Sequence, residues 1–183
     1  MNLTETAIQE ALKKYVEVYQ TSDELAASAD EYEDELDKEF REHVNNASVG
    51  TQIHYVSAQP YLIQYIDNPA KEVQLAAIAK DGRAIQYIEN PDEEVQFTVI
   101  SKHPKNIQYI KNPTEKIQYL VVQQKGTWIR LIENPTESVQ LLAIKQTPAA
   151  FQFIKNPTET VKKKNEELWK GQSYYKFNPN NKK

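Results

Sequence analysis

Apolar positions along the middle of the chain follow a pattern that returns every 22 residues. Each period contains a longer apolar stretch with helical spacing, as at 73–78, and a shorter one, as at 84–89. The dipeptide Asn-Pro separates the periods, with its Asn at Asn68, Asn90, Asn112, Asn134 and Asn156. Asn-Pro followed by Glu is typical of helix starts and not of strands. The pattern therefore predicts two short helices in each period.

The period divides residues 46–161 into about five and a half repeats. A degenerate first repeat occupies 46–67, full repeats occupy 68–89, 90–111, 112–133 and 134–155, and a truncated repeat starts at 156. One hairpin of two short helices cannot bury its apolar face alone, so neighbouring hairpins must stack. We expect an all-α fold, an α-solenoid of stacked 22-residue helical hairpins with an N-terminal helical cap.

The residues that flank these stretches indicate where each helix begins and ends. Asn is a favoured N-cap and Pro a favoured first residue, so each longer helix is expected to start at Asn-Pro. A Glu three residues after the Asn, as at Glu93, adds a capping-box signal and complements the helix dipole. Pro disfavours helical backbone before it and Gly can take a positive φ. The longer helices are therefore expected to end at Pro60, Gly82, Pro104, Gly126 and Pro148.

Five columns of apolar residues predict the core. In the longer helices the columns are Thr51, Val73, Val95, Ile117 and Val139; Ile53, Leu75, Phe97, Tyr119 and Leu141; and Val56, Ile78, Ile100, Val122 and Ile144. In the shorter helices they are Ile63, Ile85, Ile107, Ile129 and Phe151, and Ile66, Ile88, Ile110, Ile132 and Ile154. An aromatic column is also expected to be core, although Tyr hydroxyls near a surface can anchor a partner. It consists of Tyr65, Tyr87, Tyr109, Leu131 and Phe153.

The composition adds one feature to the predicted repeats, their Gln content, since the chain contains 16 Gln. Nine of them share two positions of the repeat. The column in the longer helices consists of Gln52, Gln74, Gln96, Gln118 and Gln140. The column in the shorter helices consists of Gln64, Gln86, Gln108, Arg130 and Gln152, in which Arg130 is the one residue that is not Gln. An amide both donates and accepts, so these side chains can satisfy one another or a helix end between hairpins. The alternative is a surface that binds peptide backbone or bases. The columns scarcely vary, which disfavours a base-reading code and leaves sequence-neutral binding open.

The net charge of −4 is the sum of three unlike segments. Residues 1–45 carry 13 Asp/Glu and 4 Lys/Arg, residues 46–161 carry 11 of each, and residues 162–183 carry 7 Lys and 2 Glu. This division predicts an acidic helical hairpin or cap, a neutral repeat region, and a basic C-terminal helix end and tail.

The two charged ends each have more than one interpretation. The acidic segment is a solvated cap, or a surface that attracts a basic partner or imitates a nucleic-acid backbone, with candidates Glu31, Asp34 and Glu35. A divalent-cation site at these carboxylates is disfavoured because no calcium-loop spacing is present. The basic segment closes the far end of the repeats or, with its tail, contacts nucleic acid, with candidates Lys162, Lys163 and Lys164.

The sequence contains no constellation that supports catalysis. It has no Cys, four Gly, no glycine-rich phosphate loop, and three His without paired spacing. We therefore expect no enzymatic activity, no catalytic residue, no metal and no cofactor. His54 is expected to be a packing residue. No apolar run is long enough to span a membrane and no signal peptide is evident, which predicts a cytoplasmic protein without a membrane partner.

The repeated text, IQYI-x-NP-x-EEVQ in one-letter code, resembles the short Asn-Pro and Gln-rich helical repeats of phage, prophage and bacterial proteins. The resemblance covers about residues 46–161, and that group is largely of unknown function. It implies the helical-repeat fold and a phage-like origin, and no functional residue is carried over. Because small acidic phage proteins often inhibit host enzymes or defence systems, the resemblance makes such inhibition a hypothesis by analogy.

These observations favour a non-catalytic protein-binding repeat scaffold. The resemblance adds a phage-encoded inhibitor of a host protein or defence system, an anti-CRISPR protein for example, acting in the host cytoplasm. Nucleic-acid binding through the Gln/Arg column and the basic tail is the second hypothesis, and self-assembly into a homo-oligomer through solenoid ends is the third. The candidate partner-binding residues are Gln64, Gln86, Gln108, Arg130, Gln152, Tyr65, Tyr87, Tyr109, Glu31, Asp34, Glu35, Lys162, Lys163 and Lys164.

Overall fold

The computed structural model describes residue 38 and residues 40–171, which form helices and turns without a strand. A helical segment at 40–46 comes first, and then α-helices and 3-10 helices (η) alternate along the chain. Their bounds are α3 (Val49–Ala58), η1 (Pro60–Tyr65), α4 (Lys71–Lys80), η2 (Gly82–Tyr87), α5 (Glu93–Lys102), η3 (Pro104–Tyr109), α6 (Glu115–Gln124), η4 (Gly126–Leu131), α7 (Glu137–Gln146), η5 (Pro148–Phe153) and α8 (Glu159–Gly171). The expected all-helical fold class is confirmed for this part of the chain.

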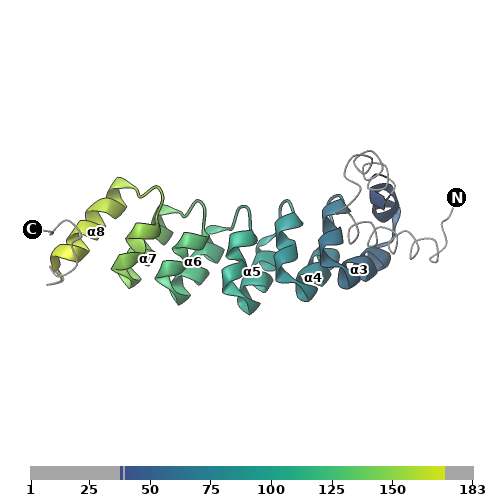
Figure 1. Ribbon diagram of the computed structural model, residues 1–183, viewed down its shortest axis with the longest axis horizontal. Helices are drawn as coiled ribbons and strands as arrows, with labels where there is room; N and C mark the ends of the chain where they lie inside the picture. Colours follow the sequence, from purple (N-terminus) through teal and green to yellow (C-terminus); the bar gives the residue numbers. More distant parts are fainter. Residues whose placement is uncertain (1–37, 39, 172–183) are drawn as a thin grey trace, which may run out of the picture.

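These elements keep the 22-residue period of the sequence. Each α-helix from α4 to α8 begins 22 residues after the one before it, and a 3-10 helix of six residues follows each of α3 to α7. Consecutive α-helices contact one another, and so do consecutive 3-10 helices. Figure 1 shows α3 to α8 following one another along the long axis of the molecule. Neighbouring repeats therefore meet through both of their helices.

The α-helices begin later than the sequence predicted, because the cap is the residue after Pro and not the Asn. In α5 the N-cap is Asp92, whose carboxylate accepts a 2.9 Å hydrogen bond from the backbone N–H of Val95. The Asn side chains of the five Asn-Pro pairs are exposed, and Glu93 is the first helical residue. The oxygen of a short Asp or Thr side chain in this place reaches the third helical N–H, so it takes the capping role.

Replacing Asp92 with Ala removes the side-chain acceptor at the start of α5. We expect the free energy of unfolding to fall by about 1 kcal/mol, the usual cost of losing an N-cap. Chemical denaturation measures this loss, with Thr136→Ala as the control, because Thr136 makes no N-cap hydrogen bond in α7. An equal loss in the two variants would contradict the capping role of Asp92.

The second element of each repeat is a 3-10 helix that starts and ends earlier than expected. In the second repeat it spans Gly82–Tyr87, and the following Ile88 is extended. Gly82 and Gly126 begin their 3-10 helices without a positive φ, so the expected C-cap role of these glycines is wrong. The α-helices before them end at Lys80 and Gln124, and their C-caps, Asp81 and Lys125, are both extended. Glycine is needed at 126 for space, because a Cβ there would lie 2.8 Å from the backbone oxygen of Ala143 in α7.

The core runs between the α-helices and the 3-10 helices. The columns that contain Val56 and Ile66 are buried in every repeat, and the column of Ile63 is buried except at the half-buried Phe151. The column of Val73 is buried from that residue to Val139. A further buried column was missed in the sequence: Tyr55, Ala77, Val99, Val121 and Ala143.

One predicted core column is only partly buried: Ile53, Leu75 and Leu141 are half-buried and pack against the core, whereas the core position expected for Phe97 and Tyr119 is wrong. In the column that begins at Ile53, Phe97 is 48% exposed and Tyr119 is 43% exposed. Each stands two residues after a buried position of its helix, which turns it about 200° away around the helix axis. His54 follows Ile53 in the first repeat and is also exposed, so the packing role expected for His54 is wrong.

Candidate functional site

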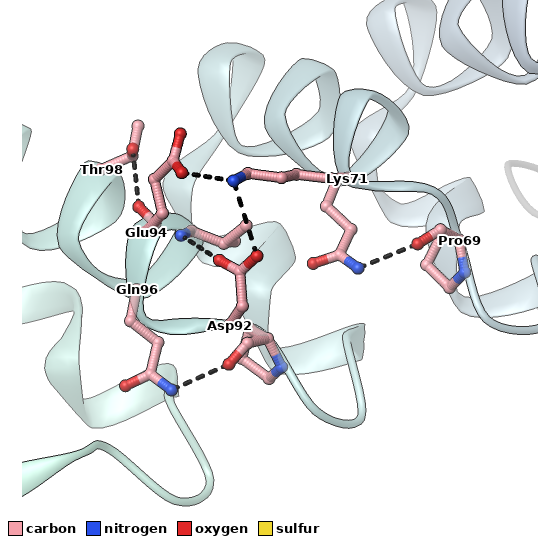
Figure 2. Close-up of polar contacts among 9 residues, drawn as sticks. Pro69, Lys71, Asp92, Glu94, Gln96 and Thr98 are labelled. Carbon is pink, nitrogen blue, oxygen red and sulfur yellow. Dashed lines mark hydrogen bonds and ion pairs between the residues drawn. The ribbon is translucent and has the colours of Figure 1, made fainter.

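The Gln column of the α-helices lies in the packed interior. Gln52, Gln96, Gln118 and Gln140 are at most 8% exposed. The Nε2 of Gln96 donates a 2.9 Å hydrogen bond to the carbonyl of Pro91, in the turn before its own helix (Figure 2). The same bond, at 2.9–3.0 Å, joins Gln74 to Pro69, Gln118 to Pro113 and Gln140 to Pro135. Each of these Gln side chains therefore holds the Asn-Pro turn against the helix that follows it.

The other end of the same amide joins a repeat to the next one. The Oε1 of Gln96 accepts a 3.0 Å hydrogen bond from the backbone N–H of Thr114, the N-cap of α6. Gln118 accepts from Thr136 at 3.1 Å, and Gln140 accepts from Thr158 at 3.4 Å. We term this arrangement the Gln clamp: one amide bonded to the Asn-Pro turn of its own repeat and to the N-cap residue of the next α-helix. The structural interpretation of this Gln column, an amide that satisfies a helix end between hairpins, is confirmed for Gln96, Gln118 and Gln140.

The join between α4 and α5 lacks one half of the Gln clamp. The Oε1 of Gln74 is buried and has no hydrogen-bond partner among the described residues. Lys71 of α4 instead reaches the carboxylates of Glu94 and Asp92, with its Nζ 3.7 Å from the Asp92 Oδ2 (Figure 2). The hydrogen bond to Glu94 raises the pKa of Lys71. Exposed ion pairs stabilise little, so we infer that this join is weaker than those with a full clamp.

The Gln column of the 3-10 helices lies on the surface. Gln64, Gln108, Arg130 and Gln152 are exposed, and Gln86 is half-buried. The guanidinium carbon of Arg130 lies 6.0 Å from the ring centroid of Phe153 in the next 3-10 helix. Arg130 therefore covers an aromatic ring of its own chain by a cation–π contact.

The aromatic column beside it is not uniformly core. Tyr65 is 6% exposed and Tyr87 is 41% exposed. The remaining members, Tyr109, Leu131 and Phe153, are half-buried. The expected core position is thus wrong for Tyr87, and its role as an anchor for a partner stays a prediction.

A hollow of about 360 Å³ brings several of the predicted partner-binding residues together. Gln86 and Tyr87 at the end of η2 line it, with Gln108 and Tyr109 at the end of η3. Leu131 of η4 extends it to a third repeat, and the volume is that of a small-ligand pocket. The other candidates of these two columns, Gln64, Arg130, Gln152 and Tyr65, do not line it.

A second hollow, of about 260 Å³, has a basic lining. It lies at the turn from α4 to η2 and includes Lys80, Arg83, Lys102 and His103, with Asp81 among them. The Nη2 of Arg83 lies 2.7 Å from the Oδ2 of Asp81, and this hydrogen bond lowers the pKa of Asp81. These residues were not among the candidates named from the sequence. The one feature of the sequence that could have indicated them is the presence of Lys and Arg beside the Pro or Gly at which each longer helix was expected to end.

The candidates at the charged ends are not brought into either hollow. Lys162, Lys163 and Lys164 are exposed on α8, where Lys162 pairs with Glu159 and Lys164 with Glu167. Glu31, Asp34, Glu35 and the C-terminal tail lie outside the described residues. Across the described part, no three His, Asp or Glu side chains are placed to hold a metal ion together. No helix there is long and apolar enough to cross a bilayer.

The larger hollow joins equivalent positions of consecutive repeats, and its lining consists of amide, phenol and aliphatic groups with one Lys and one Glu. Such a row of positions suits recognition along a surface. Comparisons with protein-family models, with curated proteins and with solved structures found no match for the chain.

Proposed function

We propose that this protein is a non-catalytic protein-binding scaffold, an α-solenoid whose stacked 22-residue hairpins present one continuous face to a partner. The observation that carries the proposal is the hollow over three repeats, where the 41% exposed Tyr87 lies beside Gln86 and Gln108. Tyr is enriched among the residues that dominate protein–protein affinity, and an amide side chain can pair with a peptide group.

The Gln clamps support this proposal, because they fix the spacing of the face before a partner arrives. Gln96, Gln118 and Gln140 each bond to the start of the next helix. A surface that is already ordered loses less conformational entropy on binding, which leaves more of the contact energy as affinity.

The specific form that we propose is a phage-encoded inhibitor of a host protein or defence system, acting in the host cytoplasm. Its support is the resemblance of the repeats at 46–161 to those of phage proteins, which is an analogy of fold. An inhibitor of this kind works by covering a surface of its target, and the face of the 3-10 helices offers the required row of contacts.

Affinity capture tests this function. The full-length chain is immobilised and incubated with a lysate of the natural host cells, and retained proteins are identified by mass spectrometry. A helical protein of similar size and net charge serves as the control. We expect at least one protein to be retained by the chain and not by the control, and the absence of any such protein would contradict the proposal.

Nucleic-acid binding is a second candidate, favoured by the basic lining of the smaller hollow. Lys80 and Lys102 are exposed there and make no ion pair within the described residues. Filter retention of single- and double-stranded DNA and RNA across a salt series tests this function. Phosphate contacts weaken steeply as salt rises, so binding at low salt that disappears at high salt is the expected result. No retention at low salt would rule the candidate out.

A further inference from the structure

In the first repeat, the helix at 40–46 covers the extended segment that follows the 3-10 helix η1. Residues 40–46 form a helix whose Asn45 lies against residues 65–67, the segment that leaves η1. The Asn45 Nδ2 donates a 2.8 Å hydrogen bond to the carbonyl of Tyr65. The backbone N–H of Asp67 donates a 2.7 Å hydrogen bond to the Asn45 Oδ1. One carboxamide thus satisfies the carbonyl and the N–H that this extended segment offers on one side.

Two other side chains of the same helix complete the cover. The ring of Phe40 meets the ring of Tyr65 edge to face, with centroids 5.5 Å apart. The guanidinium carbon of Arg41 lies 5.8 Å from the centroid of the Tyr65 ring, and its Nη1 lies 3.0 Å from the Asp67 Oδ1. Segment 65–67 therefore binds a carboxamide, a guanidinium and an aromatic ring at once.

The next three repeats have equivalent segments at 87–89, 109–111 and 131–133. These segments have the same backbone conformation as 65–67, and no helix of the described chain covers them as the helix at 40–46 covers 65–67. Their central residues Ile88, Ile110 and Ile132 are extended, with φ of −92°, −91° and −107°. Within residues 40–171, the carbonyls of residues 87, 109 and 131 and the N–H groups of residues 89, 111 and 133 make no backbone hydrogen bond and pair with no side chain as Asn45 does. The 360 Å³ hollow lies along 109–111 and 131–133 and reaches Tyr87.

We propose that these three segments together bind an extended peptide of a partner protein, whose amide groups pair with them as Asn45 pairs with 65–67. The inference rests on the proposed function and names its surface and the chemistry of its partner. Glu89 and Glu133 stand where Asp67 stands in the first repeat, and Lys111 stands between them. Charge complementarity therefore calls for Arg opposite each Glu, as Arg41 is opposite Asp67, and for an acidic residue opposite Lys111.

The distance between repeats fits such a peptide. Packed helices lie about 8–10 Å apart. Three residues of a polyproline II chain rise about 9.3 Å and return to the same face. A peptide with Arg, Glu and Arg at every third position thus meets Glu89, Lys111 and Glu133 in register. A nucleic-acid strand fits this row less well, because its phosphates carry one sign of charge while the three segments alternate.

Fluorescence anisotropy with the full-length chain tests the proposal. The probe is the labelled peptide Arg-Asn-Pro-Glu-Asn-Pro-Arg-Asn-Pro, in which Pro favours the extended form. One control peptide exchanges Arg and Glu, and a second has the same residues in the order Arg-Arg-Glu-Asn-Asn-Asn-Pro-Pro-Pro. We expect the probe to bind at least about tenfold more tightly than either control, which requires that both charge and register are read.

Variants of the chain locate the binding. Tyr87→Ala and Glu89→Lys are each expected to weaken binding of the probe about fivefold or more. Tyr119→Ala is the matched control, expected to bind as the wild type does, because Tyr119 of α6 is 43% exposed and does not line the hollow. Circular dichroism verifies that each variant is folded.

Several results would overturn the proposal: no binding of the probe, equal binding of all three peptides, or equal losses in Tyr87→Ala and Tyr119→Ala. A single-stranded oligothymidylate that binds in place of the peptides and loses affinity in Tyr87→Ala would also overturn it, with nucleic acid as the occupant. A captured partner protein whose retention is unchanged in Tyr87→Ala would leave the proposed function standing and overturn this inference alone.

Discussion

Gln118→Ala is expected to lower the free energy of unfolding by about 2–4 kcal/mol, because it leaves a carbonyl in the turn before α6 and an N–H at the start of α7 without partners. Gln118 is 5% exposed, donates to the carbonyl of Pro113 at 3.0 Å and accepts from the N–H of Thr136 at 3.1 Å. Ala can do neither, and both hydrogen bonds are partly buried. Each unsatisfied buried group costs about 1–3 kcal/mol.

Urea denaturation followed by circular dichroism measures this loss. The matched control is Gln124→Ala in the same helix, because Gln124 is exposed and makes no side-chain hydrogen bond within the described residues. We expect the control to stay within about 0.5 kcal/mol of the wild type. Similar losses in the two variants would show that the Gln clamp does not join the repeats.

Gly126→Ala is expected to lower the free energy of unfolding by about 1–3 kcal/mol, whereas Gly82→Ala is expected to have little effect. A Cβ at residue 126 would lie 2.8 Å from the backbone oxygen of Ala143, so α7 itself would have to shift. A Cβ at residue 82 would lie 2.6 Å from the Nδ2 of Asn106, the end of a side chain that can rotate away.

The two glycine variants distinguish the steric effect of an added Cβ from the effect of the glycine's backbone conformation. Neither glycine has a positive φ, so both tolerate the backbone of Ala and both gain the same small advantage from a less flexible unfolded chain. Thermal unfolding of the two variants side by side measures the difference. A loss in Gly82→Ala as large as that in Gly126→Ala would contradict the role given to the close approach of α7.

The helical period was predictable from the sequence because the same positions are buried in each repeat. The columns of Val56 and Ile66 are apolar five times over and are buried five times over. The type of the second helix was not predictable. Segments of six residues that run from a Pro or Gly to an aromatic residue, or to Leu131 in η4, are compatible with either helix type, and short 3-10 segments are common between other elements.

The position of the caps shows the limit of a local rule. Asn-Pro satisfies the usual preferences at a helix start, and the residue after it, Asp92 in α5, satisfies them as well. Only the conformation of the turn decides between the two. In the structure the Pro carbonyl is bonded to the Gln clamp, as Pro91 is to Gln96, which places the turn outside the helix.

The candidate site was half predictable. The two Gln columns look alike in sequence, yet Gln96 is buried beside two turns while Gln108 is exposed. The burial of each Gln depends on which residues surround it in space, and these residues depend on how neighbouring repeats pack. Asn45 carried no signal at all, because its two hydrogen bonds to residues 65–67 exist only once the helix at 40–46 packs against η1.

The central claim is that the 22-residue repeats are equivalent units, and that the three consecutive joins from α5 to α8 share the same Gln clamp. Small-angle X-ray scattering tests it most directly, on a chain in which a second copy of residues 112–133 is inserted between residues 133 and 134. The claim predicts a folded monomer whose longest dimension exceeds that of the wild type by about 8–10 Å, the spacing of packed helices. An unchanged dimension, or a chain that loses its helical circular dichroism, would contradict it.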